Sequence, residues 1–280
     1  MPAVFHTLWS CFLPIPTNSM PLRILRNSIV PVTIVLTFAA FWRAWTCPAG
    51  WRAWICYQIL RFHRLVFSRI RQINKCTIPE HGPAIIVSNH TSPVDPTLVW
   101  YRHFSQFRVP RLRVIGFMMA KEYYKIRGPI GWICRAMESI PVERAGRDMG
   151  PVREALRRLE CGQLLGLFPE GRINTAAPDA QLQKAGTGIA WLALKSKAPV
   201  IPVFIHNAPR SKSMIFAFLV RSKTRLSYGP PIDLSRWYTS HDEKLTQTVL
   251  CEVTDHIMRT LAELGGIQFT PCRSAVSGGR

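Results

Sequence analysis

The sequence predicts an α/β fold, with a mixed, mostly parallel sheet flanked by helices and preceded by an N-terminal membrane-docking helical segment. Short apolar runs, each the length of one buried strand, alternate with longer stretches of helical periodicity. Several apolar runs stop at polar residues, as expected where strands present ligand-binding side chains at their carboxyl ends. Basic residues and tryptophans gather before the alternating part, and they predict the docking segment.

The alternation predicts the following elements in chain order. Strands are expected at 84–88, 113–119, 138–142, 164–168, 200–206 and 224–228. Helices are expected at 93–104, 121–136, 149–160, 184–195 and 241–264. Residues 216–220 are expected to form an apolar surface strand or a membrane contact. We therefore divide the chain into a basic, Trp-rich region at 1–79, a catalytic domain at 80–264 and a disordered tail at 265–280, rich in Pro, Ser and Gly.

Charge is unevenly spread over the 280 residues, whose formal net charge is +20. Residues 1–79 contain no Asp or Glu, nine Lys or Arg, and five of the nine tryptophans. Basic residues combined with interfacial aromatics suit an anionic lipid surface. Nucleic acid is the competing partner for so basic a chain, but the region is apolar and carries no nucleic-acid-binding motif. We expect membrane lipids, and no nucleic acid, as partners.

Two segments of this region predict helices. Ile29 to Trp42 is an apolar run of 14 residues, shorter than the ~20 that span a bilayer, so a re-entrant, interfacial or buried helix all remain open. Residues 51–70 interleave arginines with aliphatic side chains, which is typical of a basic amphipathic helix lying in the membrane interface. The eight cysteines are scattered without a C-x-x-C spacing, and they predict reduced thiols in a cytosol-facing protein without a metal site.

The stretch from Asn89 to Asp95 carries the first candidate for chemistry. It places His90 and Asp95 five residues apart, in a loop between an apolar strand and a helix. The carboxylate of Asp95 can accept the Nδ1–H of His90, which leaves Nε2 free to take a proton from a hydroxyl near neutral pH. On this motif alone, Asp95 as a helix cap and His90 as an ordinary loop residue remain an equal alternative.

Three more blocks follow in order, and each is built on a short apolar run. Residues 139–144 end in Arg144, a planar cation suited to phosphate, and residues 164–172 end in Glu-Gly-Arg. Residues 198–205 form another strand with prolines near its start. A basic residue after one strand is usually only a solvated charge. The ordered set of four blocks is a much stronger signal.

The four blocks together resemble the motifs of the glycerolipid acyltransferase family, and within it the bacterial 1-acyl-sn-glycerol-3-phosphate acyltransferase group. The resemblance covers residues 80–235. The four motifs are matched by Asn89, His90, Ser92 and Asp95 (N-H-x-S-x-x-D), by Ile140, Pro141, Val142 and Arg144, by Phe168, Pro169, Glu170 and Gly171 (F-P-E-G), and by Val200 to Val203. Two departures stand out: Glu138 occupies a position that is usually glycine, and Arg172 follows Gly171 directly.

The resemblance implies a mechanism and a set of site residues. His90, held by Asp95, would deprotonate the free hydroxyl of a lysophosphatidate-like acceptor, whose oxygen attacks the thioester of acyl-CoA or acyl-carrier protein. No cofactor and no metal would be needed. Ser92 is expected to cap the following helix rather than act as a nucleophile. The remaining residues implied to bind substrate are Arg144 for the acceptor phosphate, Glu170 and Gly171 for the shape of its pocket, and Arg172 and Lys184 as further cations.

The family also implies a protein on the cytoplasmic face of a membrane, active in phospholipid biosynthesis. Two other classes of function stay open. One is a hydrolase or remodelling transacylase that uses the same His–Asp pair on lysophospholipids. The other is a membrane or nucleic-acid binder without activity, which an intact His90 and Asp95 disfavour. Acyl-chain length, acyl carrier, acceptor and oligomeric state are not fixed by the sequence.

Overall fold

The computed structural model describes residues 20–67, 69–106, 112–143, 148–176, 179–211, 213–238 and 245–272. Two compact units divide the chain after Trp45. The first contributes helix α1 (Met20–Trp45), and the second contains every motif identified above. The division thus falls before helix α2 (Gly50–Val66), whereas the sequence predicted it after Pro79. The reason is that Ala53, Cys56 and Leu60 of α2 are buried in the core of the second unit.

Helix α1 is 26 residues long, which is longer than the apolar run that predicted it. Pro31 lies inside it. A proline offers no backbone N–H to the helix. Later in the same helix, the hydroxyl of Thr37 donates to the carbonyl of Thr33, one turn earlier, at 2.9 Å. Among the residues that the structure describes, no helix has both the length and the apolar character needed to cross a bilayer.

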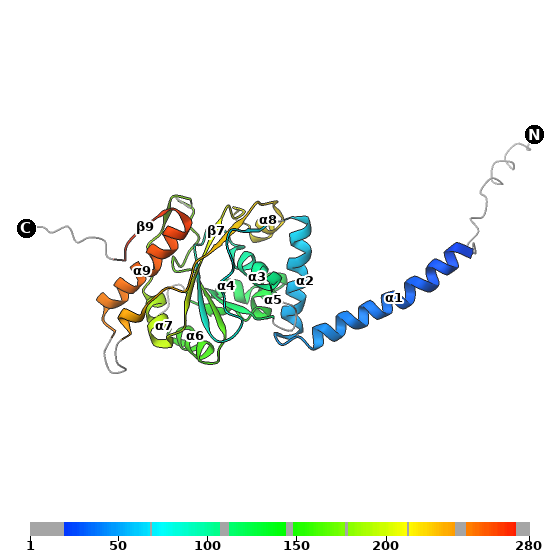
Figure 1. Cartoon of the computed structure of the whole chain (residues 1–280), viewed down its shortest axis with the longest axis horizontal. Helices are drawn as coiled ribbons and strands as arrows, with labels where there is room; N and C mark the ends of the chain where they lie inside the picture. Colours follow the sequence, from blue (N-terminus) through cyan, green and yellow to red (C-terminus); the bar gives the residue numbers. More distant parts are fainter. Residues whose placement is uncertain are drawn as a thin grey trace, which may run out of the picture. The chain divides into compact units, whose positions relative to one another are not determined.

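The second unit is built on a seven-stranded sheet (Figure 1). The strands lie in the order β1 (Arg71–Gln72), β8 (Arg225–Tyr228), β7 (Val200–His206), β2 (Ala84–Ser88), β5 (Leu164–Leu167), β3 (Ile115–Ala120) and β4 (Ile140–Val142). All neighbours are parallel except β7 and β8. The predicted mixed, mostly parallel sheet is therefore confirmed.

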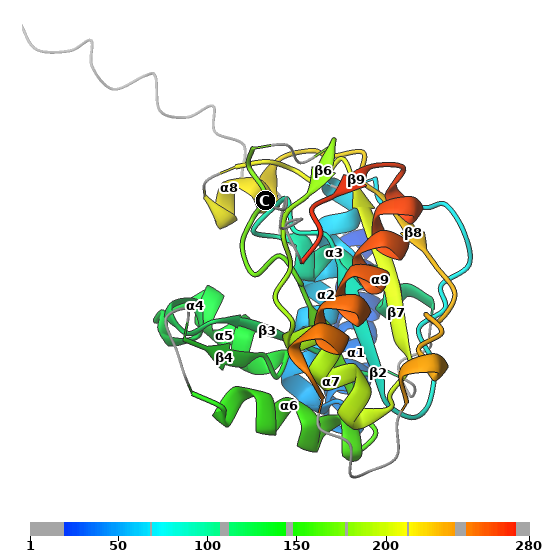
Figure 2. The same ribbon diagram turned by 90° about the vertical axis from the view of Figure 1, so that its left-hand side faces the viewer.

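Helices cover both faces of the sheet (Figures 1 and 2). Along β2, Ala84 and Ile86 face one core and Ile85 and Val87 face the other, because successive side chains of a strand point to opposite sides. The first core is closed by α2, α3 (Asp95–Gln106) and α5 (Pro129–Ala136), and the second by α6 (Gly150–Glu160), α7 (Gly188–Ser196) and α9 (Gln247–Gly265).

The structure corrects three predicted helices and strands. The single helix expected at 121–136 is two helices, α4 (Lys121–Lys125) and α5, because Gly128 has a left-handed φ of 101° and Pro129 begins the second helix. Helix α7 begins at Gly188 rather than at residue 184. Residues expected to form a surface strand at 216–220 lie instead in and just after helix α8 (Met214–Leu219).

The tail expected to be disordered from Gly265 is ordered in its first part. Gln268–Phe269 forms strand β9, which pairs in parallel with β6 (Gln181–Leu182). Helix α9 ends at Gly265, and the chain after it continues into β9, which is fixed by its pairing with β6. Residues 273–280 lie outside the described part of the chain.

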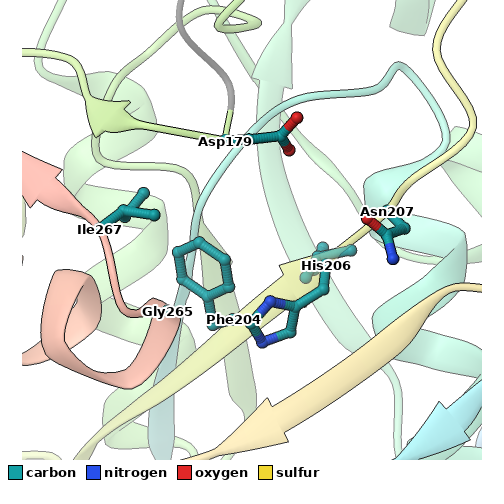
Figure 3. Close-up of a pocket in the computed structure, with 7 residues that line it drawn as sticks. Asp179, Phe204, His206, Asn207, Gly265 and Ile267 are labelled. Carbon is teal, nitrogen blue, oxygen red and sulfur yellow. The ribbon is translucent and has the colours of Figure 1, made fainter.

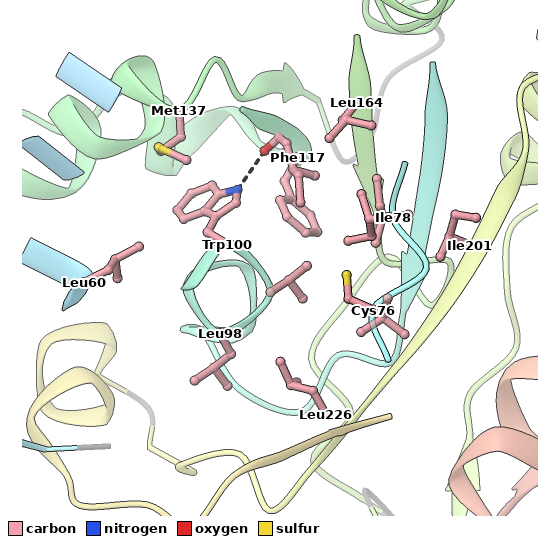
Figure 4. Close-up of a cluster of buried hydrophobic side chains, with 14 of the residues drawn as sticks. Leu60, Cys76, Ile78, Leu98, Trp100, Phe117, Met137, Leu164, Ile201 and Leu226 are labelled. Atoms are coloured by element: carbon pink, nitrogen blue, oxygen red, sulfur yellow. Dashed lines mark hydrogen bonds between the residues drawn. The ribbon is translucent and has the colours of Figure 1, made fainter. Parts of the chain in front are cut away.

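An aromatic pair fills the first core below the site. The rings of Trp100 and Phe117 meet edge to face with centroids 5.9 Å apart, and the Trp100 indole N–H donates to the carbonyl of Ile115 at 2.8 Å (Figure 4). Phe117 lies directly against Gly166 of β5, where a Cβ atom would come within 2.5 Å of the ring. Glycine is thus required at position 166 by close packing.

We predict that Gly166→Ala lowers the free energy of unfolding by about 1–3 kcal/mol, because the buried ring of Phe117 has no space to retreat. Denaturation followed by tryptophan fluorescence would measure the loss. Gly188→Ala is the matched control, since its Cβ would meet nothing within 4 Å. We expect it to change stability by no more than about 0.5 kcal/mol or to stabilise the start of α7. Equal effects of both substitutions would contradict the packing explanation.

Candidate active site

The candidate site lies where the neighbouring parallel strands β2 and β5 end. Two residues beyond β2 comes His90, and three beyond β5 comes Glu170. Because β2 and β5 run in parallel and pair directly, the loops that carry these two residues leave the same edge of the sheet. The backbone N–H of His90 donates to Oε1 of Glu170 at 3.1 Å, so the first and third motifs meet at this point.

Asn89 anchors the loop that carries His90. Its side-chain nitrogen donates to the carbonyl of Ile205 at 3.0 Å, and its oxygen accepts from the N–H of the same residue at 2.8 Å. The amide side chain thereby continues the β2–β7 ladder by one rung while the backbone turns away. Asn89 is buried, so both of its hydrogen-bonding groups depend on these partners.

Asp95 holds the imidazole of His90 as the sequence predicted. Its Oδ2 lies 2.9 Å from Nδ1 of His90 and also accepts the backbone N–H groups of Thr91 and Ser92, at 2.7 and 2.8 Å. A carboxylate only accepts hydrogen bonds, so the imidazole proton sits on Nδ1 and Nε2 carries a lone pair. The carboxyl is fully buried, which fixes the direction of the ring.

Ser92 lies in the turn before helix α3, which begins at Asp95, three residues later. Its hydroxyl accepts the backbone N–H of Val94 at 3.4 Å, as expected of a residue that caps this turn, and also donates to the carbonyl of Pro209 at 2.5 Å. Asp95 also organises the turn before its own helix, since it collects the amides of Thr91 and Ser92. Of the two alternatives left open for Asp95, the structure shows the contact with His90, whereas the N–H groups that Asp95 accepts precede the helix.

The ring of His90 rests on a column of aromatic side chains. It stacks on Phe168 with centroids 4.1 Å apart, and Phe168 stacks on Phe117 at 5.0 Å. This column joins the imidazole to the first hydrophobic core. The hydrogen bond to Asp95 and the stack on Phe168 act along different directions, so together they leave the ring little freedom to rotate.

Glu170 connects the first motif to the segment that follows β6. Its Oε2 accepts the backbone N–H of Gln183 at 2.8 Å, while Oε1 accepts that of His90. Burial raises the pKa of the Glu170 carboxyl above its usual range, and the two backbone N–H groups oppose that shift only in part. Glu170 therefore acts here as a buried connector between two loops.

A cavity of about 410 Å³ opens beside this connector. Its lining contains four of the five residues predicted to bind substrate. They are Glu170, Gly171, Arg172 and Lys184, joined by Ala185 and Gly186. Arg144, the fifth, lies outside the described residues. Glu138, which occupies the usual glycine position before it, has a left-handed φ of 50°, which explains why glycine suits that position.

Sequence reasoning missed a hydrogen-bond network that orients the wall of this cavity. Oε1 of Gln183 accepts from Nε of Arg172 at 2.7 Å, and Nε2 of Gln183 donates to Oδ1 of Asn174 at 3.0 Å. The backbone N–H of Asn174 in turn donates to the carbonyl of His90 at 2.6 Å. These links join Arg172 to the loop that carries His90. A sequence signal existed, because Asn174 lies within the departure from the family motif that begins at Arg172.

A second, smaller cavity of about 140 Å³ lies at the end of β7, where Phe204 and His206 point toward the end of α9 (Figure 3). None of its lining residues was predicted as a site residue from sequence, and one of them, Ile205, also anchors the loop of His90 through Asn89. Within the described parts of the chain, no cluster of three or more His, Cys, Asp or Glu side chains has an arrangement that could hold a metal ion.

Comparison with known proteins agrees with this geometry. A family model described as Acyltransferase matches residues 69–206. The chain is 31% identical over 132 residues to N-acylphosphatidylethanolamine synthase of Arabidopsis thaliana, and the matched region covers 46% of this chain and 45% of the relative. It is 29% identical over 160 residues to 1-acyl-sn-glycerol-3-phosphate acyltransferase of Limnanthes alba, spanning 55% of this chain and 52% of the relative. The family model and these relatives support assignment of the chain to the glycerolipid acyltransferase family.

A solved acyltransferase structure shares the fold. The crystal structure of the 1-acyl-sn-glycerophosphate acyltransferase PlsC from Thermotoga maritima superimposes with a TM-score of 0.53 at 24% identity, over 76% of this chain and 80% of that chain. The fold that the four motifs imply is thereby confirmed. The chain spans about half of the length of the Arabidopsis and Limnanthes relatives that it matches.

We predict that Glu170→Gln lowers the free energy of unfolding by about 1–3 kcal/mol, because one oxygen becomes an NH₂ group that faces a backbone N–H. Folding raises the pKa of Glu170. The protonated carboxyl therefore contributes fully to the free energy of unfolding at pH values below the usual pKa, and this contribution is lost as pH rises through the raised pKa of the folded state. The difference in the free energy of unfolding between wild type and Glu170→Gln should therefore become smaller as pH rises above about 4.

Denaturation curves over a series of pH values would measure this difference. Glu160→Gln is the matched control, because Glu160 is exposed at the end of α6. We expect it to change stability little at any pH. A difference for Glu170→Gln that grows with pH would show that the carboxyl is stabilised in its charged form instead.

Proposed function

We propose that the protein transfers a fatty acyl group from a thioester to the free hydroxyl of a lysophosphatidate-like glycerol phosphate. The observation that carries this proposal is the contact of His90 with Asp95, which leaves Nε2 available as a base. The backbone of His90 also bonds to Glu170, which lines a cavity together with the cationic Arg172 and Lys184. The Limnanthes relative, named 1-acyl-sn-glycerol-3-phosphate acyltransferase, supports the same reaction and its place in phospholipid biosynthesis.

The reaction needs one general base and no covalent intermediate. Nε2 of His90 removes the proton of the acceptor hydroxyl as the oxygen attacks the thioester carbonyl. The tetrahedral intermediate collapses, the C–S bond breaks, and the imidazolium returns its proton to the leaving thiolate. Asp95 stabilises the imidazolium through Nδ1 and keeps Nε2 aimed at the substrate. The products are the diacylated phosphate and the free thiol, with no metal required.

The acceptor phosphate is expected to meet several cations. Arg172 and Lys184 both line the cavity beside Glu170. With Nε of Arg172 committed to Gln183, its two terminal nitrogens remain to contact phosphate oxygens. Arg144, predicted from the second motif, is the third candidate. Because Glu170 holds backbone groups with both oxygens, we assign it to the shape of the cavity rather than to direct contact with the acceptor.

Two choices of substrate remain within this proposal. The donor is acyl-CoA in our first choice and acyl-carrier protein in the second. A second acceptor is the amine of phosphatidylethanolamine, which is favoured by the name of the Arabidopsis relative, N-acylphosphatidylethanolamine synthase. An assay of purified protein in detergent separates these choices. Labelled acyl-CoA and acyl-carrier protein would each be offered with lysophosphatidate, other lysophospholipids and phosphatidylethanolamine.

The proposed location is the cytoplasmic face of a membrane. The absence of acidic residues from 1–79, together with nine basic residues and five tryptophans, supports attachment to anionic lipid. The exposed apolar side chains of α1, such as Ile34, Val35 and Phe38, add a hydrophobic component. A membrane location also suits substrates whose acyl chains partition into the bilayer.

We predict that His90→Ala lowers the rate of acyl transfer by about 10²- to 10⁴-fold, because the general base is lost. Asp95→Asn should cost less, since it weakens the orientation of the ring without deleting it. Initial rates with saturating donor and acceptor would measure both effects. His81→Ala, an exposed histidine outside the site, is the matched control and should retain wild-type rates. A His90→Ala enzyme with wild-type activity would refute the mechanism.

We predict that Arg144→Ala raises the KM for a phosphorylated acceptor by about tenfold or more, with little change in the KM for the acyl donor. Arg144→Lys should restore only part of the affinity, because an ammonium lacks the planar fork that binds phosphate bidentately. Arg153→Ala on α6 serves as the control for loss of one surface arginine. A change confined to the donor KM would show that Arg144 binds the donor instead.

A further inference from the structure

Residues 266–272, which we call the returning segment, double back along helix α9 (Figure 2). Near the end of the helix, the N–H of Ile267 donates to the carbonyl of Ala262 at 3.0 Å. Further back along the helix, the N–H of Cys272 donates to Oδ1 of Asp255 at 2.6 Å. The returning segment therefore runs antiparallel to the helix that the chain has just left.

The residues of α9 that meet the returning segment follow each other at helical spacing. Asp255 lies two turns before Ala262, and Cys251 lies one further turn back, so all three share one face of the helix. A helix rises about 1.5 Å per residue and an extended chain about 3.3 Å, so the segment needs only about half as many residues to cover the same length. Cys272 consequently arrives beside Cys251.

The thiols of Cys251 and Cys272 face each other at this point. Their Sγ atoms lie 2.8 Å apart, and both cysteines are free. A disulfide bond is about 2.05 Å long, so closing it would move the two sulfurs by less than about 1 Å. Cys251 is buried and Cys272 is partly exposed, which leaves one sulfur accessible from solvent. The two cysteines are 21 residues apart, so this pairing is not visible as a C-x-x-C spacing.

We propose that Cys251 and Cys272 form a disulfide bond that fastens the returning segment to α9. The oxidant is a low-molecular-weight disulfide such as oxidised glutathione. The thiolate of Cys272 attacks this disulfide, which releases one thiol and forms a mixed disulfide. Cys251 then attacks the sulfur of Cys272 and displaces the second thiol. The two cysteines lose two electrons to the oxidant, and their two protons end on the two thiols that leave.

The surroundings of the pair favour a durable bond over one that switches quickly. Burial raises the pKa of the Cys272 thiol to about 11, and the hydrogen bond with Cys251 adds to this effect. Of the charged groups nearby, Asp255 raises this pKa further and Lys184 lowers it. Little thiolate is present near neutral pH, so the bond forms slowly. A protein disulfide is easily reduced where folding stabilises the thiolate, and the raised pKa of Cys272 shows the opposite.

The returning segment is also joined to the wall of the candidate active site. Its strand β9 pairs with β6, and the N–H of Thr270 donates to the carbonyl of Leu182 at 3.1 Å. The next residue after β6, Gln183, holds Glu170 through its backbone N–H and Arg172 through its side chain. The proposed disulfide therefore restrains one wall of the cavity as well as the returning segment.

Peptide mapping of the full-length protein tests the bond directly. Purified protein in detergent would be incubated with oxidised glutathione at about pH 8, alkylated and digested with trypsin without reduction. Trypsin cleaves after Lys and Arg, so Cys251 falls in the peptide 245–259 and Cys272 in the adjoining peptide 260–273, each with one cysteine. We expect the two peptides to be recovered as one species, about 2 Da lighter than their sum, which separates on reduction.

Two variants define this result. Cys272→Ser should give no joined peptide, whereas Cys161→Ser, which removes an exposed thiol elsewhere, should give as much as wild type. If glutathione modifies Cys161 while the two peptides stay separate, the proposal is wrong. A lasting glutathione adduct on Cys272 would overturn it as well, because Cys251 would then have failed to displace the glutathione.

Hydrogen exchange measures what the bond restrains. We expect amide exchange in residues 266–272 and 181–183 to be slower in the oxidised protein than in the reduced protein by about tenfold or more, and exchange in α6 to be the same in both. Cys272→Ser, treated with the same oxidant, is the control and should show no change. A joined peptide without slower exchange in residues 266–272 would contradict the fastening of this segment.

Acyl-transfer assays test the effect on the cavity, and this step alone rests on the proposed function. A restrained wall holds the cavity ready for the acceptor, so the oxidised protein should have a KM for the phosphorylated acceptor that is lower by about threefold, with little change in kcat. Reduction should reverse the change, and Cys272→Ser should not respond to the oxidant. An unchanged KM in an active, fully oxidised enzyme would overturn the link between the disulfide and the cavity.

The disulfide and the proposed reaction can fail separately. His90→Ala should form the joined peptide as readily as wild type, because the base has no part in thiol exchange. A protein without acyl transfer that still forms the joined peptide would refute the proposed function and support the disulfide. An active enzyme in which the two peptides never join would do the reverse.

Discussion

The buried carboxylate of Asp95 is the interaction around which the catalytic loop is built. One oxygen collects the Nδ1–H of His90 and two consecutive backbone N–H groups. A buried carboxylate is costly unless it is well hydrogen-bonded, so the loop must close around it for the protein to fold. The same closure aims the imidazole, which means that folding of the loop and orientation of the proposed base are one event. The second oxygen is buried and accepts no hydrogen bond from the described residues, so most of the stabilisation comes through the first.

A second buried carboxylate, that of Glu170, extends this arrangement to the substrate cavity. It joins the backbone of His90 to that of Gln183, and Gln183 then holds Arg172 at the cavity wall. The base and the proposed phosphate contact are thus connected through a short chain of hydrogen bonds. This connection gives a physical reason for an acidic residue in a basic cavity: its oxygens bind backbone groups and shape the wall. The third motif departs from the usual pattern at Arg172, but this residue still places an arginine at the cavity wall.

The two faces of the sheet have different surroundings. The face covered by α6, α7 and α9 is closed by an ordinary hydrophobic core. The face covered by α2, α3 and α5 contains the aromatic column below His90.

The sequence by itself predicted the family, the mixed and mostly parallel sheet, and the contact between His90 and Asp95. These follow from local patterns, because strand-length apolar runs and a five-residue spacing are both readable along the chain. Four predicted binding residues also proved to share a cavity. Only the tertiary structure decided that α2 belongs to the catalytic unit, that residues 268–269 pair with 181–182, and that Asn174 and Gln183 link Arg172 to His90. Each of these depends on segments far apart in the sequence, whose pairing is set by burial and by the need to satisfy buried polar groups rather than by any local pattern.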